Sequence, residues 1–308
     1  MPEAERPICS SISLAVGEPL VATASRFRFW LMVEQPGPWG HDAMVSSGLP
    51  VGVGRALRDL GRRLGIRVLL IKQRSREAGG RRCFAAYTGS HERWVRSFDV
   101  AEADELLDLD LPGSMGDRFR GIGEPVDGPL FLVCTHGKHD PCCARHGAPL
   151  YRALAGFGRG AAWECTHIGG DRFAGNLVCF PHGLYFGRVR PAEAETVAGS
   201  YAEGRIVLDR YRGRSAFSPP VQAAEDVVRR RFGILGVDDL ELTGHRRIGP
   251  RRHRVEFGAG DRRHVVEVEV SDLEPRQLTC KADEPAPTRG FAATELEDRA
   301  NGVSGGEG

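Results

Sequence analysis

The segment from Cys134 to Gly147, CTHGKHDPCCARHG, places three cysteines and three histidines within fourteen residues. Thiolates and imidazoles are the side chains that hold zinc and iron–sulfur centres in proteins. Adjacent cysteines such as Cys142 and Cys143 can also take part in thiol exchange, and a cysteine paired with a histidine can act as a nucleophile. The segment therefore indicates either a metal centre or a redox thiol site.

A second motif, HIGGDRFAGN, begins at His167. Its paired glycines, Gly169 and Gly170, allow the backbone to approach a ligand closely. The other cysteines, including Cys9, Cys83 and Cys280, are expected to be buried thiols with a structural role. We expect four further histidines to form hydrogen bonds in loops: His136, His139, His146 and His182.

Both motifs follow segments that read as strands. PLFLV is typical of a buried strand, so Cys134 is expected at its carboxyl end, where functional groups of α/β sheets collect. Cys143 is expected near the start of the next helix, whose amino terminus favours a thiolate. The loop after Cys134 and the loop that begins at His167 are expected to converge. The sequence therefore predicts a small metal centre at the carboxyl ends of these strands.

The elements that position this site occur twice. Residues from Phe29 to Leu107 read as strand, helix, two strands and helix, and the same order returns about a hundred residues later from Leu130 to Val197. This order predicts an α/β (α+β) fold of two tandem thioredoxin-like units. Glu34 and Ala43 fall opposite Cys134 and Cys143, so only the second unit carries the chemistry. A cluster confined to one copy is more typical of a site than of the scaffold.

The predicted domain organisation has four parts. Residues 1–125 form a first unit without ligands, and residues 126–215 form the unit that carries the Cys/His site. Residues 216–281 are predicted to be a small α+β module, with a helix beginning near Pro219 and a three-stranded antiparallel meander. Residues 282–308, which are rich in Pro, Thr, Glu and Gly, are predicted to be a disordered tail.

Composition limits the classes of partner. The 42 basic and 41 acidic side chains give a formal charge of +1, which predicts no nucleic-acid or anionic-membrane partner. The sequence shows neither a secretory signal nor an apolar run of the ~20 residues that span a bilayer, so we expect a cytoplasmic protein. In that compartment cysteines are expected to bind metal, act in catalysis or lie buried rather than form disulfides.

The two motifs, together with LYFGRVRP, carry a resemblance. CTHG with Cys143 nine residues after Cys134, followed by HIGG and FAGN, resembles the sucrase/ferredoxin-like family, a branch of the thioredoxin-like [2Fe–2S] ferredoxins, over about Phe29 to Pro220. The resemblance implies two cysteines on one iron and two histidines on the other. Carried over by position, it assigns Cys134, Cys143 and His167 as ligands, with Gly169 and Gly170 beside the cofactor.

The fourth ligand position departs from the family pattern. Asp171 stands where the cluster-binding members have their second histidine. An aspartate can bind iron, but it would lower the reduction potential relative to imidazole. We therefore rank Asp171 first, Cys142 second and Cys165 third as fourth ligand, with Cys179 a further alternative.

The resulting functional prediction is an electron carrier with a [2Fe–2S] cluster rather than an enzyme. It would exchange single electrons with a redox partner protein, either a flavoprotein or an iron protein. Two alternatives stay open: a non-redox binding module whose site holds zinc or no metal, and a thiol oxidoreductase that uses Cys142 or Cys143. No acidic pair is framed for glycoside hydrolysis, and the glycine-rich segments lack dinucleotide or P-loop spacing.

Overall fold

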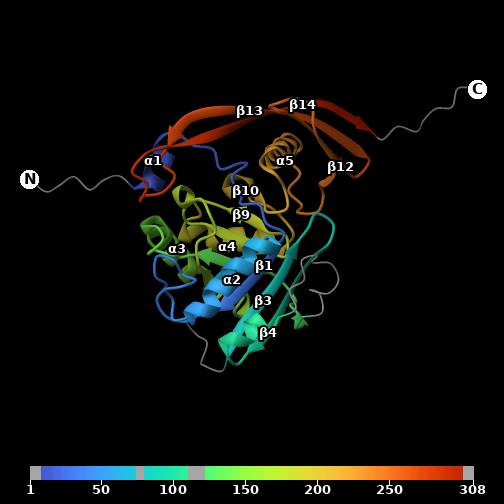
Figure 1. The fold of residues 1–308 in the computed structure, drawn as a ribbon. Helices are drawn as coiled ribbons and strands as arrows, with labels where there is room; N and C mark the ends of the chain where they lie inside the picture. The colour runs from blue at the N-terminus through green and yellow to red at the C-terminus, as the bar shows by residue number, and fades with distance from the viewer. Residues whose placement is uncertain (1–7, 74–79, 110–121, 301–308) are drawn as a thin grey trace, which may run out of the picture.

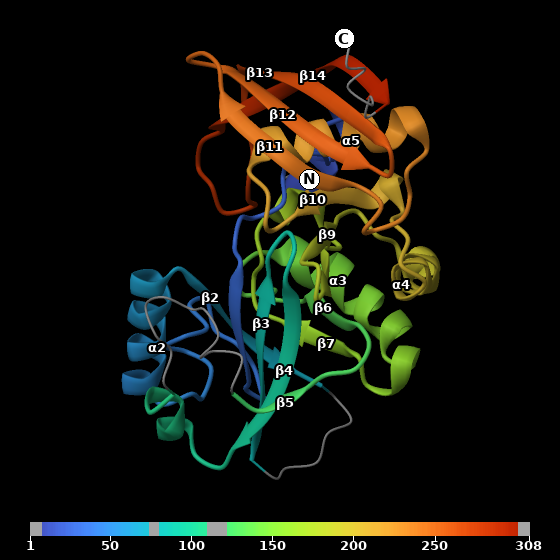
Figure 2. The same cartoon turned by 90° about the vertical axis from the view of Figure 1, so that its right-hand side faces the viewer.

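The computed structural model describes residues 8–73, 80–109 and 122–300 (Figure 1). Its centre is a ten-stranded sheet with the strand order β10-β9-β8-β6-β7-β2-β1-β3-β4-β5. A second, four-stranded sheet lies above it in the view of Figure 2, with helix α5 between the two. The fold is thus α/β, as predicted. Within the described residues, no helix is long and apolar enough to cross a membrane.

The large sheet contains two units with the same strand order, β2-β1-β3-β4 and β7-β6-β8-β9. In each unit the first two strands of the chain are parallel, and the third is antiparallel to the first. This is the order expected of tandem thioredoxin-like layers. The first unit consists of β1 (Phe29–Glu34), α2 (Val51–Leu64), β2 (Ile66–Lys72), β3 (Arg81–Thr88), β4 (Arg93–Val100) and the 3-10 helix η1 (Ala103–Leu107), with the short edge strand β5 (Glu124–Pro125) beside β4. The second consists of β6 (Leu130–Cys134), α3 (Pro141–Leu154), η3 (Phe157–Arg159), β7 (Ala162–Cys165), η4 (Asp171–Phe173), β8 (Leu177–Phe180), β9 (Leu184–Phe186), η5 (Pro191–Glu193) and α4 (Ala194–Ala202).

The two units are joined through their sheets. Strands β2 and β7 pair in antiparallel fashion, with Ile71 opposite Cys165, so the two layers form one continuous sheet. One face of this sheet buries a core to which both units contribute. The ring of Trp30 from the first unit meets the ring of Phe180 from the second edge-on, with their centroids 5.1 Å apart. The units therefore share this core, and each also buries a second core built from its own strands and helices.

The helices that follow β1 and β6 start at different distances from their strands. Residues 35–50 connect β1 to α2, whereas only residues 135–140 connect β6 to α3. The predicted hundred-residue register therefore holds for the strands but not for the helix starts. Ala43 lies in the longer loop and does not occupy the place of Cys143 at the beginning of a helix.

Local capping explains where α3 begins. The carboxylate of Asp140 accepts a hydrogen bond from the backbone N–H of Cys142, and Pro141 occupies the first turn, where its missing N–H costs nothing. Cys142 and Cys143 thus both lie in the first turn of α3, as the sequence predicts for Cys143.

The C-terminal part contains more strand than predicted. After η6 (Leu208–Arg210), β10 (Tyr211–Arg214) and α5 (Pro219–Phe232), four antiparallel strands form a sheet that packs on α5: β11 (Glu241–Arg247), β12 (Arg252–Ala259), β13 (Arg262–Arg276) and β14 (Ala286–Ala300). Residues 286–300 were expected to be disordered, and the meander was expected to have three strands. Both expectations are wrong for this segment, because backbone pairing with the long β13 determines β14. Only a few side chains of β14, such as Phe291 and Ala293, pack against the core.

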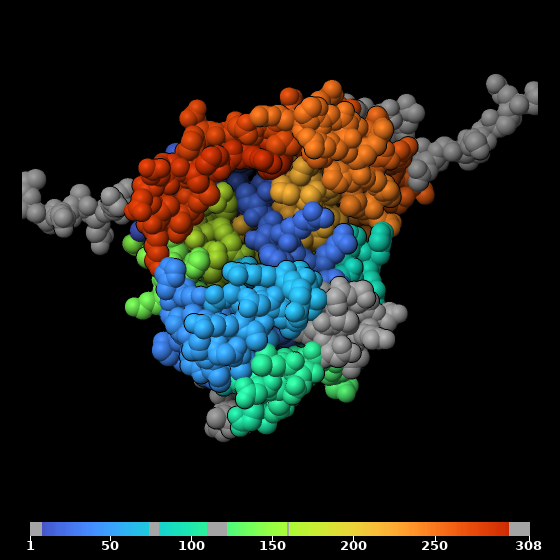
Figure 3. All heavy atoms as spheres, in the orientation of Figure 1, coloured from blue at the N-terminus to red at the C-terminus, as the bar shows by residue number. Residues whose placement is uncertain are grey.

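The start of the N-terminal segment packs on the second unit, whereas Phe27 at its end contacts Trp30 of the first unit, with ring centroids 5.9 Å apart. Helix α1 (Cys9–Ala15) places Ser10 beside His146, with 3.1 Å between the Oγ and Nε2 atoms. Glu18 accepts a hydrogen bond from Arg172 at 2.8 Å. In Figure 3 the following blue residues lie between the orange and red C-terminal sheet and the light-blue first unit. This packing differs from the predicted division, which assigned residues 1–125 to the first unit.

Candidate metal centre

Cys134, Cys143 and His167 meet at the carboxyl ends of β6 and β7. One donor atom from each lies within 4.8 Å of the other two, and the Cys143 Sγ is 4.0 Å from His167 Nδ1. Both cysteines are 1% exposed, whereas the His167 side chain is 21% exposed. The fold therefore brings together the three residues that the sequence singled out, with sulfur on the buried side.

A second group of donors shares His167 with the first. His167 Nδ1 is 2.8 Å from an oxygen of Asp171, and the same oxygen accepts a hydrogen bond from the Cys143 thiol at 3.2 Å. The ring of His139 stacks on that of His167 with centroids 3.9 Å apart, and its Nε2 lies 4.0 Å from Asp171. The site thus has a sulfur side and a nitrogen–oxygen side, and His167 belongs to both.

The sequence interpretation missed His139. We expected it to form loop hydrogen bonds, as three other histidines do: His136 contacts the carbonyl of Gly40, His146 contacts Ser10, and His182 contacts the hydroxyl of Tyr201. The only hint in the sequence was that His139 lies four residues before Cys143, in the turn that leads into a helix. That spacing alone does not distinguish a ligand from a solvated loop residue.

The predicted alternates for the fourth ligand lie elsewhere. Cys142 points away from the candidate metal centre and contacts Cys9 and Cys280. Cys165 pairs with Cys134 across parallel strands but belongs to neither donor group. Cys179 is buried in the core on the other side of the sheet. Asp171, ranked first from the sequence, lies within the centre.

The charges of the centre favour a thiolate and an imidazolium in the absence of metal. Hydrogen bonding from Cys143 lowers the pKa of Cys134 well below its ordinary value, against the effect of burial. The same contact, together with burial, raises the pKa of Cys143. Burial acts to lower the pKa of His167, but hydrogen bonds with Asp171 and Cys134 outweigh it and raise that pKa to about 9. A metal that binds here would displace protons from these groups, as is usual for thiolate and imidazole ligands.

The loop that carries His167 is held by a buried arginine from β10. Arg212 is 1% exposed and donates hydrogen bonds to the carbonyl of Gly169 at 3.0 Å and to Asn176 at 2.8 Å. It also donates to the carbonyl of Thr23 at 2.6 Å, and burial lowers its pKa to about 10. Arg212 is a positioning residue that the motifs did not indicate, because it lies 36 residues beyond Asn176.

The paired glycines shape the turn that carries His167. Both adopt positive φ, at 98° for Gly169 and 81° for Gly170. A Cβ at Gly170 would lie 2.4 Å from the Arg212 guanidinium, and one at Gly169 would lie 2.4 Å from the Ser25 hydroxyl. The glycines are therefore needed for the turn and for close packing against the protein's own side chains.

A pocket of about 480 Å³ opens beside the centre between the two units. The long loop of the first unit forms one wall, and His136 reaches across to donate a hydrogen bond from Nε2 to the Gly40 carbonyl, 2.7 Å away. Its charged and imidazole lining consists of Arg58, which is paired with Asp42, of Arg62 and Arg67, and of His41, His136, His139 and His167. The first unit, although it lacks ligands, thus shapes the approach to the centre.

Together, the fold and the site define an α/β protein with two tandem units of the same strand order and a candidate thiol–imidazole metal centre. The sucrase/ferredoxin-like family model (Suc_Fer-like) matches residues 20–213, and the chain belongs to that family. The match covers both units and strand β10, which supplies Arg212.

The chain is also similar to yeast proteins named Altered inheritance of mitochondria protein 32. It is 33% identical over 110 residues to the protein from Eremothecium gossypii, which is 31% of this chain and 35% of that protein. It is 35% identical over 103 residues to the one from Clavispora lusitaniae, covering 30% and 37% of the two chains. The chain thus spans little more than a third of the length of these relatives. No solved structure matches it significantly.

Proposed function

We propose that this protein carries single electrons through a [2Fe–2S] cluster held by Cys134, Cys143, His167 and Asp171. The observation that supports the proposal is the two-sided donor set, in which two buried thiols and a nitrogen–oxygen pair share one histidine. Iron–sulfur clusters accept thiolates on one iron and histidines on the other, as Rieske centres show. When bound, the cluster would supply a one-electron couple.

The fit of this donor set rests on chemistry and burial. The thiols lie in the core at the ends of β6 and α3, where water is excluded, whereas the side chains of His167 and His139 are 21% and 34% exposed. The imidazole edge therefore offers the short route between the centre and a partner. Arg212 and Asn176 hold the loop so that His167 and Asp171 keep their places.

The surroundings favour a redox partner protein with an acidic docking face. Arg58, Arg62 and Arg67 line the pocket beside the exposed imidazoles. We propose a flavoprotein or an iron protein as this partner, with no nucleic acid or membrane involved.

Electron exchange with an acidic partner should slow as ionic strength rises, because salt screens the attraction between the two proteins. The Debye length, the distance over which charges act, is ~8 Å at 0.15 M salt. An Arg62→Gln variant should show a weaker salt dependence, and equal dependence in both proteins would contradict the docking surface.

We further propose that the protein works in the cytoplasm. Its eight cysteines are all free thiols in the structure, although several lie close enough to pair. A reducing compartment maintains that state.

Anaerobic purification tests the cluster directly. The expected result is a red-brown protein with two iron atoms and two sulfides per chain and an electron paramagnetic resonance signal after one-electron reduction. Cys134→Ser and Cys143→Ser should each lose the iron, while Cys179→Ser, a buried cysteine outside the centre, should keep it. Full iron and an unchanged spectrum in either ligand variant would contradict the assignment.

The second candidate is a non-redox module with a zinc ion on Cys134, Cys143 and His167, since zinc accepts this donor set. A colourless protein with zinc bound through these three residues would favour the zinc module.

A thiol oxidoreductase is less well supported. Cys142 and Cys143 are 0% and 1% exposed, and their sulfurs belong to different groups, so a substrate disulfide has no access to them as a pair.

A further inference from the structure

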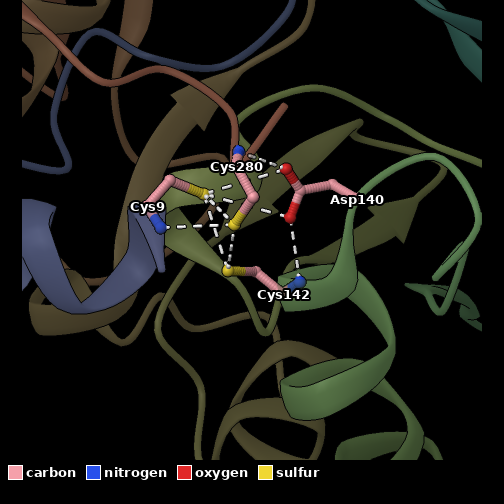
Figure 4. Close-up of side chains that lie close together, drawn as sticks. All are labelled: Cys9, Asp140, Cys142 and Cys280. Carbon is pink, nitrogen blue, oxygen red and sulfur yellow. Dashed lines mark hydrogen bonds between the residues drawn. The ribbon is translucent and has the colours of Figure 1, made fainter. Parts of the chain in front are cut away.

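Three cysteines that are far apart in the sequence meet outside the candidate metal centre. The sulfur atoms of Cys9, Cys142 and Cys280 form a triangle whose sides are 3.5, 3.4 and 3.5 Å (Figure 4). We call these residues the thiol triad. They come from α1, from the first turn of α3 and from the loop between β13 and β14, with sequence separations of 133 and 138 residues. Cys9 and Cys280 were expected to be isolated structural thiols, and the fold instead brings them together.

A triangle of this size suits one metal ion. A point about 2.3 Å from all three sulfurs, the usual zinc–sulfur distance, exists just outside the plane of the triangle. A disulfide would join two of the sulfurs and leave the third without a role. The near-equal sides therefore favour a single tetrahedral ion.

Asp140 adds charge to the same place. Its carboxylate is 0% exposed and lies 3.9 Å from the Cys9 Sγ. It accepts hydrogen bonds from the N–H groups of Cys142 and Cys280 and from the Thr279 hydroxyl, but among the described residues it forms no ion pair. The three thiols and the buried carboxylate together form a donor set that suits a metal cation.

The thiol triad is separate from the candidate metal centre although their residues adjoin. Consecutive residues of a helix point about 100° apart, so Cys142 faces the thiol triad while Cys143 faces Cys134. The two groups share no ligand. A metal in one does not require a metal in the other.

We propose that Cys9, Cys142 and Cys280 bind a structural zinc ion, with Asp140 or a water molecule as fourth ligand. The ion connects the N-terminal helix, the helix that carries Cys143 and the loop of the C-terminal sheet. In Figure 1 these are the dark-blue α1, the green α3 and the red turn beside them. Such a zinc site would fix both ends of the described chain onto the second unit, independently of any electron transfer.

Metal analysis of the full-length protein tests this proposal. The expected result is one zinc per chain that Cys280→Ser and Cys9→Ser both remove, with iron content and visible absorption unchanged. Cys280 is partly exposed, so its replacement should leave the fold intact. Cys83→Ser, at a buried cysteine outside both groups, is the matched control and should keep the zinc. Cobalt substitution should give the intense thiolate charge-transfer and tetrahedral bands of a sulfur-rich site, and Cys280→Ser should weaken them.

Two results would overturn the zinc site. One is a protein that binds no zinc, or loses none when Cys9 or Cys280 is replaced. The other is a native disulfide between two triad cysteines in protein purified under reducing conditions. If instead the candidate metal centre also holds zinc, the chain should contain two zinc ions, of which Cys280→Ser removes one and Cys134→Ser the other. That outcome would contradict the electron carrier and leave the thiol triad supported.

Discussion

At the scale of single residues, the candidate metal centre depends on how one histidine is shared. His167 Nδ1 lies near both the Cys143 sulfur and the Asp171 carboxylate, and the ring of His139 stacks on that of His167. The assignment of Cys134, Cys143 and His167 as ligands rests on sulfur and imidazole chemistry. The assignment of the fourth ligand rests on position, because Asp171 and His139 are both within reach of the other donors.

We predict that Asp171 is the fourth ligand. Replacing it with alanine should lower the iron content and shift the visible spectrum, whereas His139→Ala should keep full iron. Asp171→His should retain the cluster and raise its reduction potential, because imidazole is a softer and neutral ligand. Iron analysis and redox titration of the three variants measure this. Loss of iron in His139→Ala, with full iron in Asp171→Ala, would assign the position to His139.

His182 should make the stability of the protein depend on pH. Burial, helped by Arg93, lowers its pKa from 6.5 to about 4. Between those values the unfolded chain binds a proton that the folded protein does not, so the free energy of unfolding should fall as the pH decreases from 6.5 toward 4. The His182→Gln variant should lose less stability than the wild type between pH 7 and pH 5 in urea titrations. Parallel losses in the two proteins would show that other groups dominate.

At the scale of elements, the loop with His167 depends on a strand distant in sequence. Arg212 of β10 connects Gly169, Asn176 and Thr23, and it lies over the ring of Phe173. A second buried cluster connects the same strand to α5, where Glu225 contacts Tyr211, Arg214 and Arg229. Strand β10 therefore links the metal loop to the C-terminal part.

We predict that Arg212→Met reduces stability and loosens the centre. The substitution leaves the buried carbonyls of Gly169 and Thr23 without a donor, at a cost of about 3 kcal/mol or more. Urea denaturation should show this loss, and iron should dissociate faster in the presence of a chelator. Arg190→Met, at an exposed arginine paired with Glu193, is the control and should change neither quantity. Normal iron retention in Arg212→Met would show that Arg212 does not position the loop that carries His167.

At the scale of the whole molecule, the two units form one folding unit. The strands β2 and β7 pair directly, and Thr88 of the first unit shares a hydrogen bond of 2.8 Å with Ser215 after the second. Trp30, 0% exposed, contacts aromatic rings of both halves and donates to Thr88. The ligand-free unit is therefore part of the core that supports the centre.

We predict that Trp30→Ala destabilises both units together. The loss of a fully buried indole should cost about 3–5 kcal/mol of unfolding free energy. Near-ultraviolet circular dichroism and the absorption of the metal centre should change in a single transition at lower denaturant concentration. Leu14→Ala, at an exposed leucine of α1, should have little effect. Separate transitions for the two probes in the wild type would contradict a shared core.

The sequence by itself determined the strand and helix pattern and pointed to Cys134, Cys143 and His167 as candidate donors, while the family resemblance added Asp171. The strand and helix pattern follows from local information, because apolar runs and turn residues reflect short-range physics along the chain. Only the tertiary structure decided that Arg212 holds the metal loop and that Cys9, Cys142 and Cys280 meet. It also decided that residues 286–300 form β14, because these residues pair with β13. The contacts of Arg212 and of the thiol triad join residues more than thirty positions apart, and no local pattern records which distant segment will supply such partners.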